Sequence, residues 1–184
     1  MNKTTPSAPP LSEALQRARR LVRDVPDFPK KGILFRDVTP LLQDGAAVRD
    51  VVTAMAAPWR GQVDVVAGME SRGFIFGVGL ALELGVGFIP VRKKGKLPFK
   101  TESIQYGLEY GSDQLEIHLD ACRSNQRVLV CDDLIATGGT AQATAQLIER
   151  VGGIVAGYAF LIELRELEGR KRLGNRRADA LFVY

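Results

Sequence analysis

Residues 128–140 read VLVCDDLIATGGT, an apolar run followed by two adjacent carboxylates and a turn of small residues. Residues 128–131 are continuously apolar and follow a polar cluster, a pattern typical of a buried parallel strand. Residues 136–140 then open a helix that continues to about Val151. The stretch therefore predicts a strand, a loop and a helix N-terminus in succession.

The predicted helix start has the properties of an anion site. Its first backbone N–H groups are unpaired and carry positive partial charge, so a phosphate can bind where no side chain blocks the approach. Gly138 and Gly139 leave the approach open, and the hydroxyls of Thr137 and Thr140 add hydrogen-bond donors beside Ala136. The alternative is a structural turn, with glycine for its geometry and aspartate as a helix cap.

Asp132 and Asp133 come directly before this loop. Two carboxylates facing a phosphate would repel it, but they suit the vicinal hydroxyls of a ribose or a magnesium ion coordinated by it. No Gly-Lys-Ser/Thr follows the glycines, and the run is not G-x-G-x-x-G, so neither common nucleotide loop applies. The residues predict a site for a phosphorylated sugar.

The same stretch closely resembles the phosphoribosyl pyrophosphate (PRPP) signature of the type I phosphoribosyltransferases. A second run, D-F-P-x-x-G-x-x-F-R-D at residues 27–37, is similar to the base-binding hood of the adenine phosphoribosyltransferases. The resemblance implies that Phe35 stacks on a purine and that backbone groups of Leu34 and Arg36 read its edge. It also implies that Leu164 lies on the far side of the base.

Residues 68–73, GMESRG, resemble the family's pyrophosphate loop, with Arg72 as the cation. They follow a predicted strand, and active sites of open parallel sheets gather at carboxyl ends of strands. In relatives this loop carries a non-proline cis peptide, expected here between Glu70 and Ser71. The basic run at residues 92–96 is either a solvated turn or a further pyrophosphate contact, and the resemblance favours Lys93 and Lys96 for that contact.

Residues 106–111, YGLEYG, resemble the family's catalytic loop, which usually has Ser where Gly107 stands. The run lies in a predicted hairpin at about residues 95–120 that can serve as a lid. The resemblance makes Glu109 the catalytic candidate for proton exchange at the purine ring and places Tyr110 in the lid.

Composition supports one domain, because 184 residues with 46% hydrophobic content can build a single core. The net charge of +4 suits polyphosphate ligands and falls short of a dedicated nucleic-acid binder. Two cysteines do not make a disulfide framework, which favours the cytoplasm. No apolar run is long enough to span a membrane, and one histidine allows no histidine-rich zinc site.

The remaining segments complete the expected organisation. We expect a disordered leader at residues 1–10 and a single domain at 11–184, with the hood at about 24–40. A charged helix and loop at 165–177 is expected on the surface. Helices are expected at 11–23, 46–57 and 74–84, and strands at 63–67, 86–91, 154–164 and 180–184.

The resemblance implies an α/β fold, a mainly parallel sheet flanked by helices with a small N-terminal hood and a flexible hairpin lid. It further implies transfer of the 5-phosphoribosyl group from PRPP to adenine, giving AMP and pyrophosphate. Mg²⁺ would be held mainly by PRPP, with no certain direct protein ligand. The expected partners are adenine and PRPP, without nucleic acid or membrane, in a homodimer.

Two other interpretations stay open at this point. The same chemistry could act on hypoxanthine, guanine, xanthine or orotate, because backbone recognition of a base leaves little side-chain signature. Some phosphoribosyltransferase-like proteins instead sense PRPP and regulate transcription or RNA termination. The residues before Pro26 are too few for an independently stable winged helix.

Overall fold

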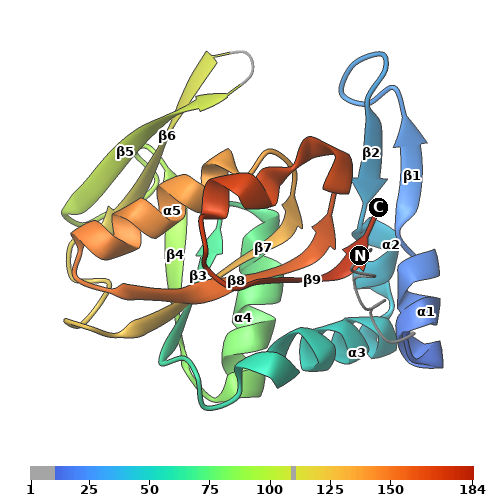
Figure 1. Ribbon diagram of the computed structural model, residues 1–184, viewed down its shortest axis with the longest axis horizontal. Helices are drawn as coiled ribbons and strands as arrows, with labels where there is room; N and C mark the ends of the chain where they lie inside the picture. The colour runs from blue at the N-terminus through green and yellow to red at the C-terminus, as the bar shows by residue number, and fades with distance from the viewer. Residues whose placement is uncertain (1–10, 109–110) are drawn as a thin grey trace, which may run out of the picture. The chain divides into compact units, whose positions relative to one another are not determined.

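Two units, Met1–Val51 and Val52–Tyr184, divide the chain. The computed structural model describes residues 11–108 and 111–184, so the expected leader at residues 1–10 lies outside the described residues. Each unit has its own sheet (Figure 1).

The first unit contains a short antiparallel hairpin between two helical segments. Strands β1 (Arg23–Pro26) and β2 (Leu34–Asp37) pair so that Arg23 faces Asp37 and Asp24 faces Arg36. Both facing pairs form ion pairs across the strands. The first helix therefore ends before Arg23, because the chain enters the hairpin where helix was expected. The helices of this unit are α1 (Glu13–Arg20), α2 (Thr39–Gln43) and the first part of α3 (Gly45–Ala56).

The second unit is built on a seven-stranded sheet with the order β5-β6-β4-β3-β7-β8-β9. Strands β4, β3, β7, β8 and β9 are neighbours in that order and pair in parallel. The β5–β6 hairpin extends the sheet through antiparallel pairing of β6 with β4. The strands are β3 (Val65–Met69), β4 (Gly87–Lys93), β5 (Thr101–Leu108), β6 (Gly111–His118), β7 (Arg127–Ile135), β8 (Ile154–Glu163) and β9 (Ala178–Val183).

Helices cover both faces of this sheet. The connection from β3 through α4 (Arg72–Leu84) leads to one side, and the connection from β7 through α5 (Gly139–Arg150) leads to the other. Because such crossovers are right-handed, opposite directions put the two helices on opposite faces, as Figure 1 shows. The predicted α/β fold with a mainly parallel sheet flanked by helices is confirmed.

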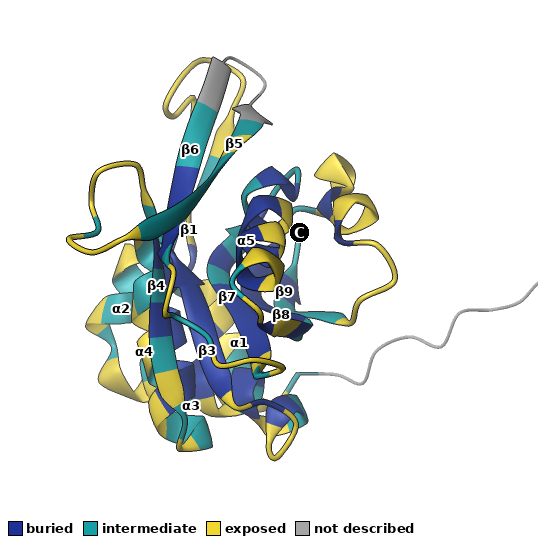
Figure 2. Ribbon diagram, turned by 90° about the vertical axis from the view of Figure 1, so that its left-hand side faces the viewer, coloured by how far each residue is buried: buried dark blue, intermediate teal, exposed yellow. Residues whose placement is uncertain are grey.

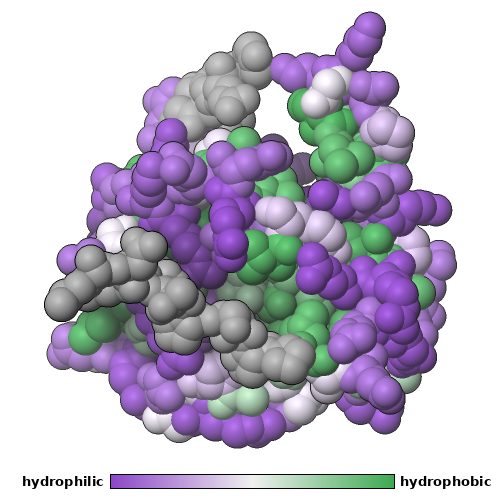
Figure 3. Space-filling model, turned by 45° about the vertical axis from the view of Figure 1, so that its right-hand side comes forward, coloured by the Kyte–Doolittle hydropathy of each residue, from purple (hydrophilic) through white to green (hydrophobic). Residues whose placement is uncertain are grey.

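The core lies on both sides of the central strands, and β3 is buried along its whole length (Figure 2). Alternate residues of β3, including Val65 and Ala67, pack in a buried cluster with Leu147 and Ile148 of α5. On the other face, Gly77 allows α4 to approach β3 closely, because a Cβ built on Gly77 would lie 3.4 Å from the Cα of Gly68. Hydrophilic residues cover much of the surface seen in Figure 3.

Strand β7 is longer than the sequence predicted. It continues past Cys131 through both aspartates to Ile135, which pairs with Glu163 of β8. The extension is stable because β8 runs alongside and supplies hydrogen-bond partners to the backbone. The two carboxylates are therefore carried by a strand, where the sequence predicted a loop.

The segment expected to be a charged surface helix forms two 3₁₀ turns, η2 (Arg165–Leu167) and η3 (Gly169–Leu173). Most of its residues are exposed, but Gly169 and Leu173 are buried. Elsewhere, η1 (Ala57–Trp59) follows α3. Within the ranges described above, no helix is long and apolar enough to cross a membrane.

Gly157 of β8 marks a close contact between η1 and the sheet. A Cβ there would lie 2.3 Å from Cη2 of Trp59 and 2.6 Å from the carbonyl oxygen of Arg177. The Trp59 ring is buried and has the Arg177 guanidinium 4.4 Å from its centroid. The ring therefore packs directly on the strand backbone.

We expect Gly157→Ala to lower the free energy of unfolding by about 2 kcal/mol, because the added methyl group overpacks this contact. Urea unfolding measures the change. Gly87→Ala in β4 is the matched control, since its methyl group would meet only Val65 at 3.7 Å. Equal stability of the two variants would show that the contact with Trp59 can accommodate a methyl group.

Candidate active site

The candidate site lies at the carboxyl ends of β3 and β7. These strands are neighbours, and their crossover helices leave in opposite directions. Such a switch point is where open parallel sheets bind ligands. Helix α4 begins at Arg72 and α5 begins at Gly139, and no side chain caps either N-terminus. Two helix starts with available amides therefore follow directly from these two strand ends.

The phosphate-binding loop predicted from the sequence leads from β7 into α5, and its last two residues, Gly139 and Thr140, begin the helix. Gly138 has a φ of 79° in the left-handed region, which glycine adopts without strain. A cavity of about 90 Å³ adjoins the loop. Its lining includes all five predicted phosphate-binding residues, Ala136, Thr137, Gly138, Gly139 and Thr140. The alternative of a turn closed by an aspartate cap does not fit, because the α5 N-terminus has no side-chain cap.

A larger cavity of about 600 Å³ brings most of the other predicted residues together. Arg72 and Lys93 line it with Thr140 of the loop, and Lys96 does not. Residues that the sequence did not single out also line it, from the β3 end and from the β5–β6 hairpin. The full lining is Glu70, Ser71, Arg72, Lys93, Tyr106, Asp113, Leu115, Asp132, Asp133, Leu134 and Thr140.

Asp132 and Asp133 form a tightly coupled pair. Asp132 lines both cavities and its Oδ1 accepts a hydrogen bond of 2.9 Å from the Asp133 amide. Asp133 is only 4% exposed, and its Oδ2 lies 2.8 Å from Nε of Arg72. Removal from water and the neighbouring carboxylate raise the pKa of Asp132 well above its usual value. Burial raises the pKa of Asp133, and the Arg72 guanidinium opposes that rise.

The peptide bond between Glu70 and Ser71 is cis, as the resemblance predicted. The Glu70 carboxylate accepts a hydrogen bond of 3.0 Å from the Lys93 amide and lies 3.2 Å from Nε of Arg92. Burial acts to raise the pKa of Glu70, but the Lys93 amide and Arg92 outweigh it, so the pKa is lowered. Arg92 also donates to the carbonyl of Lys96 at 3.0 Å. Glu70 therefore links the segment after β3 to the basic residues at the end of β4.

Two hairpin residues complete the site and were missed by sequence reasoning. Asp113 of β6 lies 3.0 Å from Nζ of Lys93, and this contact raises the pKa of Lys93. Burial raises the pKa of Tyr106, whose side chain hydrogen bonds with Thr140 and Asp113. Tyr106 and Asp113 are directly opposite in the β5–β6 register. Only that strand register could have indicated the pairing.

Four other predicted site residues do not line these two cavities. Leu34, Phe35 and Arg36 belong to β2 in the first unit, where the Phe35 ring meets Phe28 edge to face with centroids 5.0 Å apart. Leu164 follows the end of β8 and is half-buried. Glu109 and Tyr110 lie outside the described residues.

In the part of the chain that the structure describes, no group of three or more His, Cys, Asp and Glu side chains is placed to hold a metal ion. Of the two carboxylates just before residues 136–140, that of Asp133 already forms an ion pair with Arg72.

Comparison with known proteins agrees with this geometry. Residues 41–182 match the family model described as phosphoribosyl transferase domain. An adenine phosphoribosyltransferase of Methylococcus capsulatus is 55% identical over 92% of this chain and 100% of its own length. The crystal structure of adenine phosphoribosyltransferase from Thermoanaerobacter pseudethanolicus covers 92% of this chain and 99% of its own, with a TM-score of 0.90 and 50% identity. The Saccharomyces cerevisiae enzyme, solved with adenine and an imino-altritol bisphosphate, covers 93% and 99%, with a TM-score of 0.88 and 38% identity.

The raised pKa of Asp132 predicts a stability cost with a defined pH dependence. A carboxyl group whose pKa is higher in the folded than in the unfolded protein destabilises the fold when it ionises. That cost is absent below the unfolded-state pKa of about 4 and grows as the pH rises. We expect Asp132→Asn to raise the free energy of unfolding by about 0.5 to 2 kcal/mol at pH 8, and the gain to vanish toward about pH 4.

Urea unfolding across this pH range tests the expectation, with Asp64→Asn as the control of opposite sign. Hydrogen bonds from Arg127 lower the pKa of Asp64 to about 2. Its replacement should therefore destabilise at pH 8, with a loss that fades as the pH falls toward about 2. A pH-independent loss of stability in Asp132→Asn would contradict the prediction that ionised Asp132 destabilises the fold.

Proposed function

The chain belongs to the phosphoribosyltransferase family, and from this premise we propose how its residues transfer the 5-phosphoribosyl group of PRPP to adenine. The reaction gives AMP and pyrophosphate and serves purine salvage. One observation carries the residue assignment: the N-terminus of α5 has no side-chain cap. Its residue Thr140 lines the same cavity as Arg72 and the two aspartates.

The loop of Ala136, Thr137, Gly138, Gly139 and Thr140 binds the 5′-phosphate. The free amides and positive end of α5 provide the charge complement. This group does not react and is held alike in the ground state and the transition state, so its binding energy keeps PRPP in place throughout the reaction.

Asp132 and Asp133 bind the ribose hydroxyls. Breaking the bond from C1 to pyrophosphate leaves positive charge on the ribose ring, and a nearby carboxylate stabilises that charge. Asp132 is the better placed of the two, because it lines both cavities. Asp133 has a second task, since its ion pair holds Arg72 in place.

Arg72, Lys93 and Lys96 neutralise the departing pyrophosphate. Arg72 and Lys93 each have a carboxylate partner within 3.0 Å, Asp133 and Asp113 respectively. A pyrophosphate that reaches them competes with these partners for the same cations. Mg²⁺ carried by PRPP would add positive charge at the same oxygen atoms.

The hood at about residues 24–40 binds adenine in this proposal. Phe35 stacks on the purine, backbone groups of Leu34 and Arg36 read its edge, and Leu164 lies on its other side. Support comes from the D-F-P-x-x-G-x-x-F-R-D run and from the yeast relative solved with adenine. The lid at about residues 95–120 carries Tyr110 and the catalytic Glu109, which exchanges a proton with the purine ring.

We propose that the protein is a homodimer. Helix α4 exposes three apolar side chains at helical spacing: Ile75 at 47%, Val78 at 42% and Leu82 at 77%. They share one face, and such a face is stabilised when a second copy covers it. Sedimentation equilibrium of the wild-type protein and of Leu82→Glu tests this, because a monomeric wild type would refute the proposal.

A cytoplasmic location without nucleic-acid or membrane partners is part of the same proposal. Both cysteines, Cys122 and Cys131, are unpaired, as is usual in a reducing compartment. Many of the basic side chains form ion pairs with carboxylates, including three arginines near the C-terminus, which leaves less free charge for polyanions. A filter-binding assay at low salt and cell fractionation test the two statements.

The choice of base is tested directly. We expect the purified chain, with Mg²⁺ and PRPP, to form AMP from adenine with a kcat/KM at least about 100-fold above that for other bases, because a site built on hydrogen bonds to the amino group rejects bases without it. The comparison bases are hypoxanthine, guanine, xanthine and orotate. The rate with each base is measured as release of pyrophosphate. Equal use of any of them would overturn the adenine assignment.

We expect Glu109→Gln to lower kcat by about 100-fold or more, the usual contribution of a positioned acid or base. PRPP binding, measured by calorimetry, should persist because the phosphate and pyrophosphate contacts are unchanged. Glu102→Gln on β5 is the control, since Glu102 pairs with Arg150 and does not line the large cavity. If both variants turn over like the wild type, Glu109 does not have this role.

A further inference from the structure

A buried glycine near the C-terminus lies directly against the phosphate-binding loop. Gly169 is buried, although its neighbours Glu168 and Arg170 are exposed. A Cβ built on Gly169 would lie 2.2 Å from the carbonyl oxygen of Ala136 and 3.0 Å from the amide nitrogen of Gly138. A carbon atom cannot approach an oxygen atom to 2.2 Å, so any side chain here would have to displace backbone.

The contact is reciprocal. A Cβ on Gly138 would lie 2.3 Å from the carbonyl oxygen of Gly169. Gly138 also has a positive φ, whereas Gly169 does not, so space alone requires glycine at Gly169. The cavity beside the loop is lined by Ala136, Gly138 and their neighbours but not by Gly169. Gly169 therefore supports the loop backbone without lining the space that a ligand would fill.

The side chain next to Gly169 anchors this support. Arg170 forms two hydrogen bonds of 2.7 Å to the carboxylate of Glu163, which is buried at the end of β8. It also donates to the carbonyl of Ala178 at the start of β9. Glu163 pairs in register with Ile135, the residue just before the loop. The bidentate pair thus ties the supporting segment to the strand beside the loop.

We propose that Gly169 is a positioning residue for the 5′-phosphate, and that Arg170 fixes how closely its backbone supports residues 136–138. Hydrogen bonds from amides to a phosphate depend steeply on distance and angle, so a displaced loop loses affinity for the phosphate group specifically. The proposal rests on the proposed function, because it requires that the loop bind the phosphate.

Gly169→Ala provides the test. We expect it to raise the KM for PRPP and the Kd for ribose 5-phosphate about tenfold, as overpacking pushes the loop forward. The Kd for adenine and kcat at saturating PRPP should change less than about twofold, since the removed interaction is made equally in ground and transition states. A purely structural defect would lower the fraction of active protein, and thus kcat, without this selectivity.

Gly87→Ala is the matched control, because its Cβ meets only Val65 at 3.7 Å. It should leave all four values unchanged. Gly169→Ala with kinetics and ribose 5-phosphate affinity like those of Gly87→Ala would overturn the proposal, as would equal losses of adenine and ribose 5-phosphate affinity.

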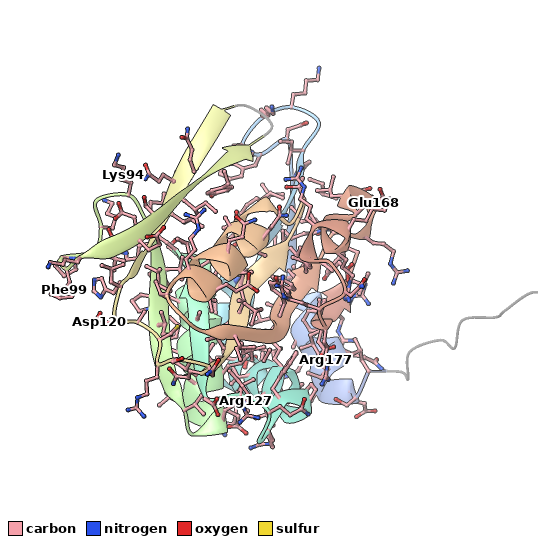
Figure 4. All side chains as sticks on the ribbon, turned by 60° about the vertical axis from the view of Figure 1, so that its left-hand side comes forward. Lys94, Phe99, Asp120, Arg127, Glu168 and Arg177 are labelled. Carbon is pink, nitrogen blue, oxygen red and sulfur yellow. The ribbon has the colours of Figure 1, made fainter. Side chains whose placement is uncertain are left out.

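A second pair of variants decides the matter if Gly169→Ala does not fold. Arg170→Lys keeps the charge and loses the bidentate geometry, and its side chain is 46% exposed. Its control is Arg127→Lys, which also loses a bidentate bond to a carboxylate, with Asp64, and is equally exposed. Arg127 is the first residue of β7 and lies at the other end of that strand from residues 136–140. In Figure 4, the label of Arg127 marks that end, and the label of Glu168 marks the segment next to Gly169.

We expect the KM for PRPP to rise about threefold in Arg170→Lys and not at all in Arg127→Lys, since only the first pair anchors the loop support. Equal values in the two variants would refute the role of Arg170. The wild-type protein separates this inference from the proposed function: a wild type that binds adenine but not ribose 5-phosphate refutes the phosphate site itself. An active wild type with unaffected variants refutes only the role of Gly169 and Arg170.

Discussion

The parallel pairing of β3 with β7 is the constraint on which the site depends. Their crossover connections leave in opposite directions, so α4 and α5 lie on opposite faces while their N-termini start at the same edge of the sheet. The short segments after β3 and β7 then carry amides, carboxylates and a guanidinium toward one space. Without this pairing, residues 70–72 and 132–140 would share no surface.

Charge balance is the second theme of the site. Each cation that lines the large cavity has an acidic partner, Arg72 with Asp133 and Lys93 with Asp113. Asp132 differs from these pairs, because removal from water, with the Asp133 carboxylate beside it, raises its pKa well above the usual value. The site is therefore prepared for a ligand that brings both negative groups for the cations and hydroxyl donors for the carboxylates. PRPP has both.

The sequence was sufficient where chemistry and spacing coincide in a short run. The strand and helix around residues 128–140 and the turn of small residues that lines the first cavity follow from local patterns, and the family resemblance of residues 68–73 singled out Arg72, which lines the second. It failed where partners distant in the chain decide the outcome. Strand β7 continues through two aspartates, poor strand formers, because β8 pairs with them. Gly169 is surrounded in the sequence by charged residues, and no hydrophobic periodicity marks it as buried. The contact of Tyr106 with Asp113 depends on the register of the hairpin.

The location of Asp132 and Asp133 within β7 has an energetic consequence of its own. Backbone held in a hydrogen-bonded ladder has already lost its conformational entropy on folding, so a ligand that bonds to these carboxylates immobilises little that is still free. The part of the site that we propose to bind the sugar is thus preorganised. The hydrogen bond from the Asp133 amide to Asp132 and the ion pair of Asp133 with Arg72 also hold the two side chains. Carboxylates held in this way distinguish sugars by their stereochemistry more sharply than the same residues on a flexible loop.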